Sequence, residues 1–368
     1  MKLSKICLNI TDGTHSSITD DVNGDYYLLS CKNIKNGKII ISNNERKINF
    51  ETFLTLNKRT KLSQNDILIT TVGTIGEIAI INSKDINYDF QRSVGILKVN
   101  TEIMLPKYVY YYLQSNSAQQ KINSLVKGAV QKCLFLKDIG NIEIIYKSTL
   151  EQHHIVNIIG TIDDLIEKYA EIIKKIEQYI LLEYNKLMIE TGLKFKDVFK
   201  VFNGGTFNSS DYLAESKYKL ITIKNIDANG FNPDFPTYIP LMKEYEKYRL
   251  NIGDILLTMT GAYLGRSGIV DEDNCFLNQR VLKIESTSKS FLYCFLKYNQ
   301  QDIFNLGKGS AQPNLSLTDL YEFPINYSFE SISYFSKNDI YLKVLLDLKI
   351  KIKQLKTLKN NYLNKFFK

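Results

Sequence analysis

The chain contains one stretch of sequence twice. KGAVQKCLFLKD at residues 127–138 returns as KGSAQPNLSLTD at residues 308–319, about half of the 368-residue chain later. Other matches follow in the same order in both halves: Gly13-Thr14 with Gly205-Thr206, Lys32-Asn33-Ile34 with Lys224-Asn225-Ile226, Asp66-Ile67-Leu68 with Asp254-Ile255-Leu256, and Gln91-Arg92 with Gln279-Arg280. Chance similarity does not preserve such an order. The chain is therefore predicted to consist of two copies of one folding unit.

Each copy begins with a segment of mixed secondary structure. The apolar runs DILIT, EIAII and VGILKV are separated by Gly, Asn and Asp, and this pattern predicts short strands joined by turns. The stretch that starts at Pro106 predicts a helix, because proline is favoured at the first helical position.

Each copy ends in a segment that predicts a long helix. Ser148 and Glu151 have the spacing of a capping box, which marks the first helix start. Apolar residues then recur at alternating spacings of three and four, the pattern of a helix packed lengthwise on another helix. The expected packing residues are Ile155, Ile158, Ile162, Leu165, Tyr169, Ile172, Ile176 and Tyr179 in the first helix, and Leu345, Leu348, Ile352, Leu355, Tyr362 and Phe366 in the second, where Lys359 interrupts the pattern.

These patterns predict an α+β (mixed α/β) fold with two globular domains. The domains are expected at 1–147 and 192–327, and the helices at 148–191 and 328–368. The second helix can return along the first, so an antiparallel coiled coil would separate the domains with approximate two-fold symmetry. At 1.5 Å per residue, a helix of about 40 residues would be about 60 Å long.

Two related domains on a rigid support suit double-stranded DNA, whose groove surfaces recur about every 34–36 Å. The net charge of +8 is compatible with such a polyanionic partner. Because the two copies differ, the target is expected to be bipartite and asymmetric. Positions that both copies share suit a scaffold or phosphate-contacting role. Specificity is expected in the divergent segments His15–Tyr27, Lys38–Lys61, Phe207–Tyr218 and Phe231–Arg249.

The candidate DNA contacts are polar residues in or beside these segments and the repeated motifs. They are Thr14, His15, Lys32, Asn33, Arg46, Lys47, Arg59, Gln91, Arg92, Lys127 and Gln131 in the first copy, and Thr206, Lys224, Asn225, Tyr263, Arg266, Gln279, Arg280, Lys308 and Gln312 in the second.

No catalytic or metal-binding residue is predicted. The five cysteines lack a CxxC pair, and no further ligands stand at metal spacing beside His153-His154. The string NPDF at 232–235 lacks the second proline of an adenine methyltransferase motif, and GKGS at 307–310 lacks the spacing of a Walker loop. No apolar run approaches the about 18 residues that span a bilayer, so a soluble protein is expected.

The order of the motifs resembles the specificity subunit of type I restriction–modification enzymes. DGTH, KNIKNGKI, DILITTVGTIGEIAI, FQRSVGIL, KGAVQKCLFLKDIGNIEI and LEQHHIVNII resemble one target-recognition domain with its spacer helix. GGTFNSS, KNIDANG, GDILLTMTGAYLGRSGIV, NQRVLKI and GSAQPNLSLTDLYEFPI repeat that order. The second copy departs from it in having NYSFESISYF where the first has Leu-Glu-Gln at 150–152.

The resemblance implies a non-catalytic subunit in the cytoplasm of a bacterium or archaeon. Two DNA methyltransferase subunits holding S-adenosylmethionine would dock on it and methylate adenine N6, and restriction subunits would use ATP and Mg²⁺. Two alternatives remain open: an accessory subunit of a combined restriction-methylation enzyme, and a coiled-coil assembly protein that binds no DNA.

Overall fold

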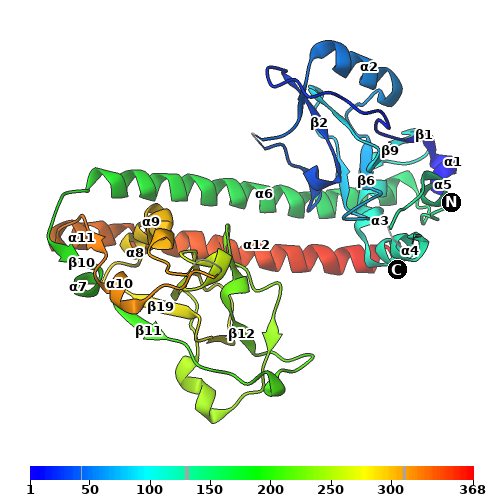
Figure 1. The fold of residues 1–368 in the computed structure, drawn as a ribbon. Coiled ribbons are helices and arrows are strands. Elements are labelled where there is room, and N and C mark those ends of the chain that lie inside the picture. Colours follow the sequence, from blue (N-terminus) through cyan, green and yellow to red (C-terminus); the bar gives the residue numbers. More distant parts are fainter. Residues whose placement is uncertain (43, 129–131, 310–311) are drawn as a thin grey trace. The chain divides into compact units, whose positions relative to one another are not determined.

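The structure, a computed structural model, describes residues 1–368 except 43, 129–131 and 310–311. The chain divides into two compact units, which are coloured along the sequence in Figure 1. Unit 1 comprises Met1–Leu165 with Leu355–Lys368, and unit 2 comprises Ile166–Gln354. Both long helices therefore contribute to both units. The boundaries expected from the sequence lay instead at the ends of the helices, between them and the globular segments.

Unit 1 contains a four-stranded sheet in the order β1-β9-β6-β7, a three-stranded sheet in the order β5-β2-β8, and the hairpin β3-β4. Its strands are β1 (Cys7–Asp12), β2 (Tyr26–Leu29), β3 (Ile34–Lys35), β4 (Lys38–Ile39), β5 (Lys47–Ile48), β6 (Ile67–Thr70), β7 (Ile78–Ile80), β8 (Tyr88–Phe90) and β9 (Val94–Val99). Its shorter helices are α1 (Leu3–Ile6), α2 (Phe50–Thr60), α3 (Pro106–Gln114), α4 (Asn116–Leu125) and α5 (Leu136–Gly140).

Strand β6 is buried on both faces, which explains its continuous apolar sequence. Successive side chains of a strand point to opposite faces. Ile67 and Ile69 pack into one core with the tyrosines of α3, and Leu68 packs into a second core with Leu29 and Phe90. Thus one face of the sheet is covered by helices and the other by the smaller sheet.

Unit 2 repeats these three sheets in the same strand order, as β11-β19-β16-β17, β15-β12-β18 and the hairpin β13-β14, and adds the two-stranded sheet β10-β20. Its strands are β10 (Leu193–Lys194), β11 (Lys200–Asn203), β12 (Lys219–Ile221), β13 (Ile226–Asp227), β14 (Gly230–Phe231), β15 (Thr237–Tyr238), β16 (Ile255–Thr258), β17 (Ser267–Ile269), β18 (Cys275–Leu277), β19 (Val281–Glu285) and β20 (Pro324–Ile325). Its shorter helices are α7 (Phe195–Val198), α8 (Lys289–Tyr298), α9 (Gln300–Asn305), α10 (Leu317–Tyr321) and α11 (Phe329–Phe335).

The two long helices are α6 (Thr149–Lys186) and α12 (Asp339–Phe366). The capping box before α6 is confirmed: the Ser148 backbone N–H donates to the Glu151 carboxylate over 2.9 Å, and the Glu151 N–H lies 3.4 Å from Ser148 Oγ. The second helix begins at Asp339 rather than at 328, because α11 and a 3-10 turn at Ser336–Asn338 precede it. Lys359, which interrupts the apolar pattern, donates to Asp163 over 2.8 Å within unit 1.

Of the residues predicted to pack in α6, Ile155 and Ile162 are buried, but at two other places the buried residue is the neighbour of the predicted one. Ile159 and Ile180 are fully buried, whereas Tyr179, expected in the seam, is 42% exposed. Near the end of the chain, Leu363 of α12 and Phe367, which directly follows α12, are more deeply buried than the predicted Tyr362 and Phe366. Because neighbouring residues are both apolar at these places, the spacing of three and four fits either of two adjacent helix faces. The packing within each unit determines which face is buried.

The predicted mixed α/β class with two related units and long helices is confirmed. The predicted two-fold relation between the units stays a prediction. Among the helices of the described residues, none combines the length and hydropathy that a bilayer span needs.

Candidate nucleic-acid interface

In each unit, the residues that directly follow the first strand of the large sheet contact the turn between two later strands. A Cβ atom at Gly13 would lie 2.0 Å from the Phe90 carbonyl oxygen, and one at Gly204 would lie 2.2 Å from that of Asn278. Only glycine fits at such a distance. Gly13 and Gly204 are therefore structural counterparts.

This pairing corrects the alignment of the two copies. Thr14 forms an isolated bridge with Gln91, and Gly205 forms the same bridge with Asn278. The structural counterpart of Thr14 is therefore Gly205. The sequence comparison had matched Thr14 with the next residue, Thr206.

The Gln-Arg pair shifts in the same way. Gln91 and Asn278 are half-buried bridge residues, and the next residues, Arg92 and Gln279, are exposed in the turn. Arg92 therefore matches Gln279 and not Arg280, which takes the place of Ser93. The two turns present different side chains at corresponding positions, although both sequences contain a Gln-Arg pair.

Around the turn in unit 1, a carboxylate joins three segments of the chain. Asp12, at the end of β1, accepts from His15 Nε2 over 2.7 Å and also from the Arg59 guanidinium at the end of α2. Asp12 is mostly buried, whereas the side chains of His15 and Arg59 are about half exposed. The carboxylate thus holds two cationic or hydrogen-bonding groups at the surface.

The corresponding position in unit 2 is neutral. Thr206 Oγ1 donates to Gln279 Oε1 over 2.8 Å, and both residues are exposed. Asn203 stands where unit 1 has Asp12. The two units therefore present different hydrogen-bonding groups on the same backbone frame.

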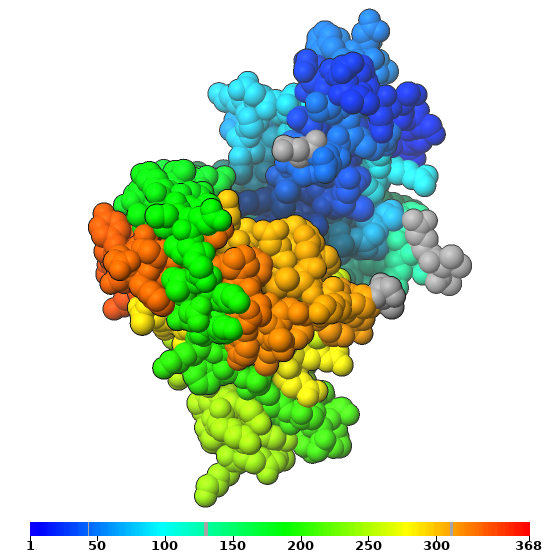
Figure 2. Space-filling model, turned by 60° about the vertical axis from the view of Figure 1, so that its left-hand side comes forward, coloured from blue at the N-terminus to red at the C-terminus, as the bar shows by residue number. Residues whose placement is uncertain are grey.

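The divergent segments also fold differently. Between the small sheet and β6, unit 1 forms the helix α2, where Phe53 stacks on Tyr26 with ring centroids 4.3 Å apart. Unit 2 forms the 3-10 helix η4 (Lys243–Tyr248), where Tyr245 packs on Phe207 at 4.4 Å. The yellow-green segment with η4 projects from the rest of unit 2 (Figure 2).

Several candidate residues that both copies share are engaged within their own unit. Lys127 pairs with Asp138 at 2.9 Å, and Lys308 pairs with Asp319 at 2.7 Å. Gly128 and Gly309 both have φ of 113°, where a side chain would be strained. The described residues at the start of these loops therefore have the same pairing and backbone conformation in both units, which favours the scaffold role. Gln131 lies outside the described residues.

The shared asparagines cap 3-10 turns. Asn33 and Asn225 are buried, and each accepts a backbone N–H over 2.9 Å, from Ser30 and Thr222 respectively. Their amide nitrogens donate to the carbonyl oxygens of Ile40 and Asn232. This bonding also favours a scaffold role. Lys32 pairs with Glu45 at 3.0 Å, and Lys224 is exposed.

The remaining candidates lie apart from these turns in sequence. Arg46 donates to Asp20 over 2.6 Å and to the Ile18 carbonyl, and its neighbour Lys47 lies in β5. The Arg266 guanidinium lies 4.7 Å from the Tyr263 ring centroid. The side chain of Gln312 lies beside Gly261. The role of these residues as DNA contacts stays a prediction.

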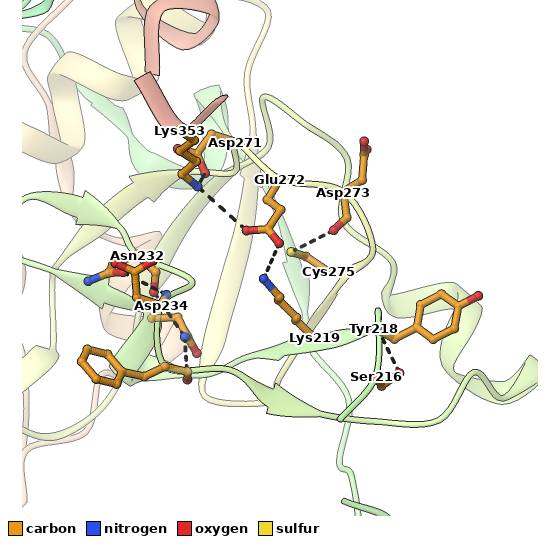
Figure 3. Close-up of polar contacts among 12 residues, drawn as sticks. Ser216, Tyr218, Lys219, Asn232, Asp234, Asp271, Glu272, Asp273, Cys275 and Lys353 are labelled. Carbon is orange, nitrogen blue, oxygen red and sulfur yellow. Dashed lines mark hydrogen bonds and ion pairs between the residues drawn. The ribbon is translucent and has the colours of Figure 1, made fainter. Parts of the chain in front are cut away.

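Unit 2 also contains an ion network that was not predicted from the sequence (Figure 3). Lys353 of α12 pairs with Asp271 at 2.5 Å and lies 4.0 Å from Glu272, which also pairs with Lys219 of β12. Burial raises the pKa of Asp271, and the hydrogen bond from Lys353 opposes that rise. The network fastens this part of α12 to the sheet that carries the Gln279 turn.

Comparisons with known proteins agree with the repeated architecture. The family model described as type I restriction modification DNA specificity domain matches residues 12–178 and 192–328. The type I restriction enzyme EcoBI specificity subunit of Escherichia coli is 33% identical over 168 residues, which cover 46% of this chain and 34% of that protein. This alignment spans about a third of that relative's length.

A second relative aligns over most of the chain. The type I restriction enzyme MjaIX specificity subunit of Methanocaldococcus jannaschii is 24% identical over 332 residues, which cover 81% of this chain and 75% of that protein. Among solved structures, the type I restriction-modification system S subunit from M. genitalium has a TM-score of 0.63 at 18% identity, covering 100% of this chain and 95% of that one. This chain has the same fold.

Proposed function

Because this chain belongs to the type I restriction modification DNA specificity family, we propose that it selects the DNA sequence on which a type I restriction–modification complex acts. Each unit would read one half of a bipartite target. The observation that carries this proposal is the repeated topology with different side chains and different inserted segments at corresponding places. A common frame would place both reading surfaces alike, and the divergent groups would select different bases.

Partners would supply the chemistry. Two modification subunits with bound S-adenosylmethionine would methylate adenine N6 in each half of the target, and restriction subunits would use ATP and Mg²⁺. This chain would contribute binding and spacing. The long helices α6 and α12, which contribute to both units, would set the number of unread base pairs between the halves.

A binding selection tests the proposal. The full chain, alone and with a modification subunit, is incubated with random duplex DNA, and the bound sequences are determined. Recovery of two short specified blocks around a fixed gap is expected. The affinity should fall steeply with salt, because contacts to phosphates release counterions. Recovery of no motif at any salt concentration would favour the coiled-coil assembly protein that binds no DNA.

A domain exchange tests the assignment of one unit to one block. Replacing residues 1–147 by the corresponding segment of another specificity subunit should change one block of the recovered motif and leave the other unchanged. The unaltered chain is the reference. A change in both blocks would contradict the assignment.

A further inference from the structure

The corrected alignment makes Arg92 and Gln279 counterparts that differ. Each is an exposed residue of a turn between a strand of the small sheet and the second strand of the large sheet, and in unit 2 the next residue, Arg280, is exposed as well. The Arg92 N–H donates to the Thr14 carbonyl over 2.9 Å, and the Gln279 N–H donates to the Gly205 carbonyl over 2.8 Å. Both side chains therefore project from the same fixed backbone position in their units.

We propose that this turn position reads a base in each half of the target, and the inference rests on the proposed DNA-binding function. Arginine pairs with both acceptors of guanine, O6 and N7, whereas glutamine pairs with N6 and N7 of adenine. Arg92 would therefore select guanine in the half read by unit 1. Gln279 would select adenine in the half read by unit 2.

The surroundings of each side chain support a reading role. In unit 1, Asp12 pairs with His15 and Arg59, and within the described residues no carboxylate pairs with Arg92. In unit 2, the hydroxyl of Thr206 donates to Gln279 Oε1, which orients the amide, and no acceptor among the described residues binds its nitrogen. Pre-oriented groups on a rigid turn lose little conformational freedom on binding.

A phosphate contact explains this position less well. Arginine and glutamine can both donate to a phosphate. A phosphate contact common to both halves gives no reason for a change of side chain, however, because the backbone of DNA is the same everywhere. The position instead carries a cation in unit 1 and a neutral amide in unit 2. A change of hydrogen-bonding pattern on a constant frame is what reading of different bases requires.

Two reciprocal substitutions test the proposal, with the full chain in the selection on random duplexes. Arg92→Gln should change the preferred base at one position of one block from guanine to adenine, with a preference altered about tenfold or more. Gln279→Arg should make the opposite change at one position of the other block. Both residues are exposed, so folding, checked by circular dichroism, should not change.

The control is Lys84→Gln, which makes the same charge change in unit 1 on the exposed loop that precedes β8. It should leave the motif unchanged. An unchanged motif with a smaller salt dependence for Arg92→Gln would identify a phosphate contact and overturn the proposal. A change of the second block by Arg280→Gln, but not by Gln279→Arg, would overturn the corrected alignment. If the unaltered chain recovers no motif, the proposed DNA-binding function itself fails.

Discussion

Corresponding residues of the two units can differ in the core as well as at the surface. Asp89 in β8 is fully buried, and its counterpart in β18, Phe276, is an apolar core residue. The Asp89 carboxylate accepts from Thr60 Oγ1 over 2.6 Å and from the Phe90 N–H over 2.7 Å. Thr60 ends α2, so this carboxylate anchors a helix that only unit 1 has.

The buried carboxylate predicts a pH dependence of stability. Burial raises the pKa of Asp89, although the hydrogen bonds from Thr60 and the Phe90 N–H oppose the rise. The folded state then binds the proton more tightly than the unfolded state does, where the pKa is about 3.9. The stability that Asp89 contributes is therefore largest below that value and is lost as the pH rises through the folded pKa.

Asp89→Asn should remove this loss, because the amide does not ionise. The free energy of unfolding of the variant, measured by urea unfolding and circular dichroism, should rise relative to the unaltered chain as the pH increases from about 4 to 7. A constant difference between the two proteins across this range would contradict the assignment.

Many of the residues that correspond between the two units could be identified from the sequence, but the correspondence within two turns could not. Identity placed Gly13 opposite Gly205, although the neighbouring Gly204 is the residue whose Cβ atom would meet the backbone of the opposite turn. Two adjacent glycines satisfy the pattern equally well, and only the contact with the opposite turn distinguishes them. The same ambiguity hid the correspondence of Arg92 with Gln279.

At the scale of the elements, the buried face of α6 predicts that substitutions at two neighbouring residues will affect stability very differently. Ile180 is fully buried in the core of unit 2, whereas Tyr179 is 42% exposed and contacts Tyr341 with ring centroids 5.1 Å apart. Ile180→Ala should lower the free energy of unfolding by about 2–5 kcal/mol. Tyr179→Ala should lower the free energy of unfolding by only about 1 kcal/mol. Urea unfolding of both variants measures this, and equal losses would favour the seam predicted from the sequence.

The sequence predicted the existence of the long helices and the α6 cap, because heptad spacing and capping boxes are local patterns. It could not choose between Ile158 and Ile159, or between Tyr179 and Ile180, because both members of each pair are apolar. The choice depends on residues distant in sequence, such as those of α8 and α11 that belong to the same core as Ile180. It also missed the Lys353 network, since a lysine within a lysine-rich helix gives no sign of which acidic residue it pairs with.

At the scale of the whole molecule, unit 1 is assembled from two distant parts of the chain. Phe367 is 1% exposed and packs on Tyr108 and Tyr112 of α3, with ring centroids 5.3 and 5.6 Å apart. Ser117 Oγ also donates to the Phe367 carbonyl over 2.7 Å. The core of unit 1 therefore requires residues that follow the whole of unit 2 in sequence.

Phe367→Ala should destabilise unit 1 by about 3–5 kcal/mol. Hydrogen exchange should become faster in α3 and β9, and it should stay unchanged in β16 of unit 2. Phe366→Ala, at the half-buried neighbouring position, is the matched control and should have a smaller effect. Equal acceleration in β16 would show that the two units do not unfold separately.

This discontinuity has a consequence for biosynthesis. Residues 355–368 leave the ribosome after all of Ile166–Gln354 has been translated. At typical elongation rates the delay is on the order of ten to forty seconds. During that time the nascent amino-terminal half would keep the aromatic surface of α3 uncovered, so the half that is synthesised first would be the last to mature.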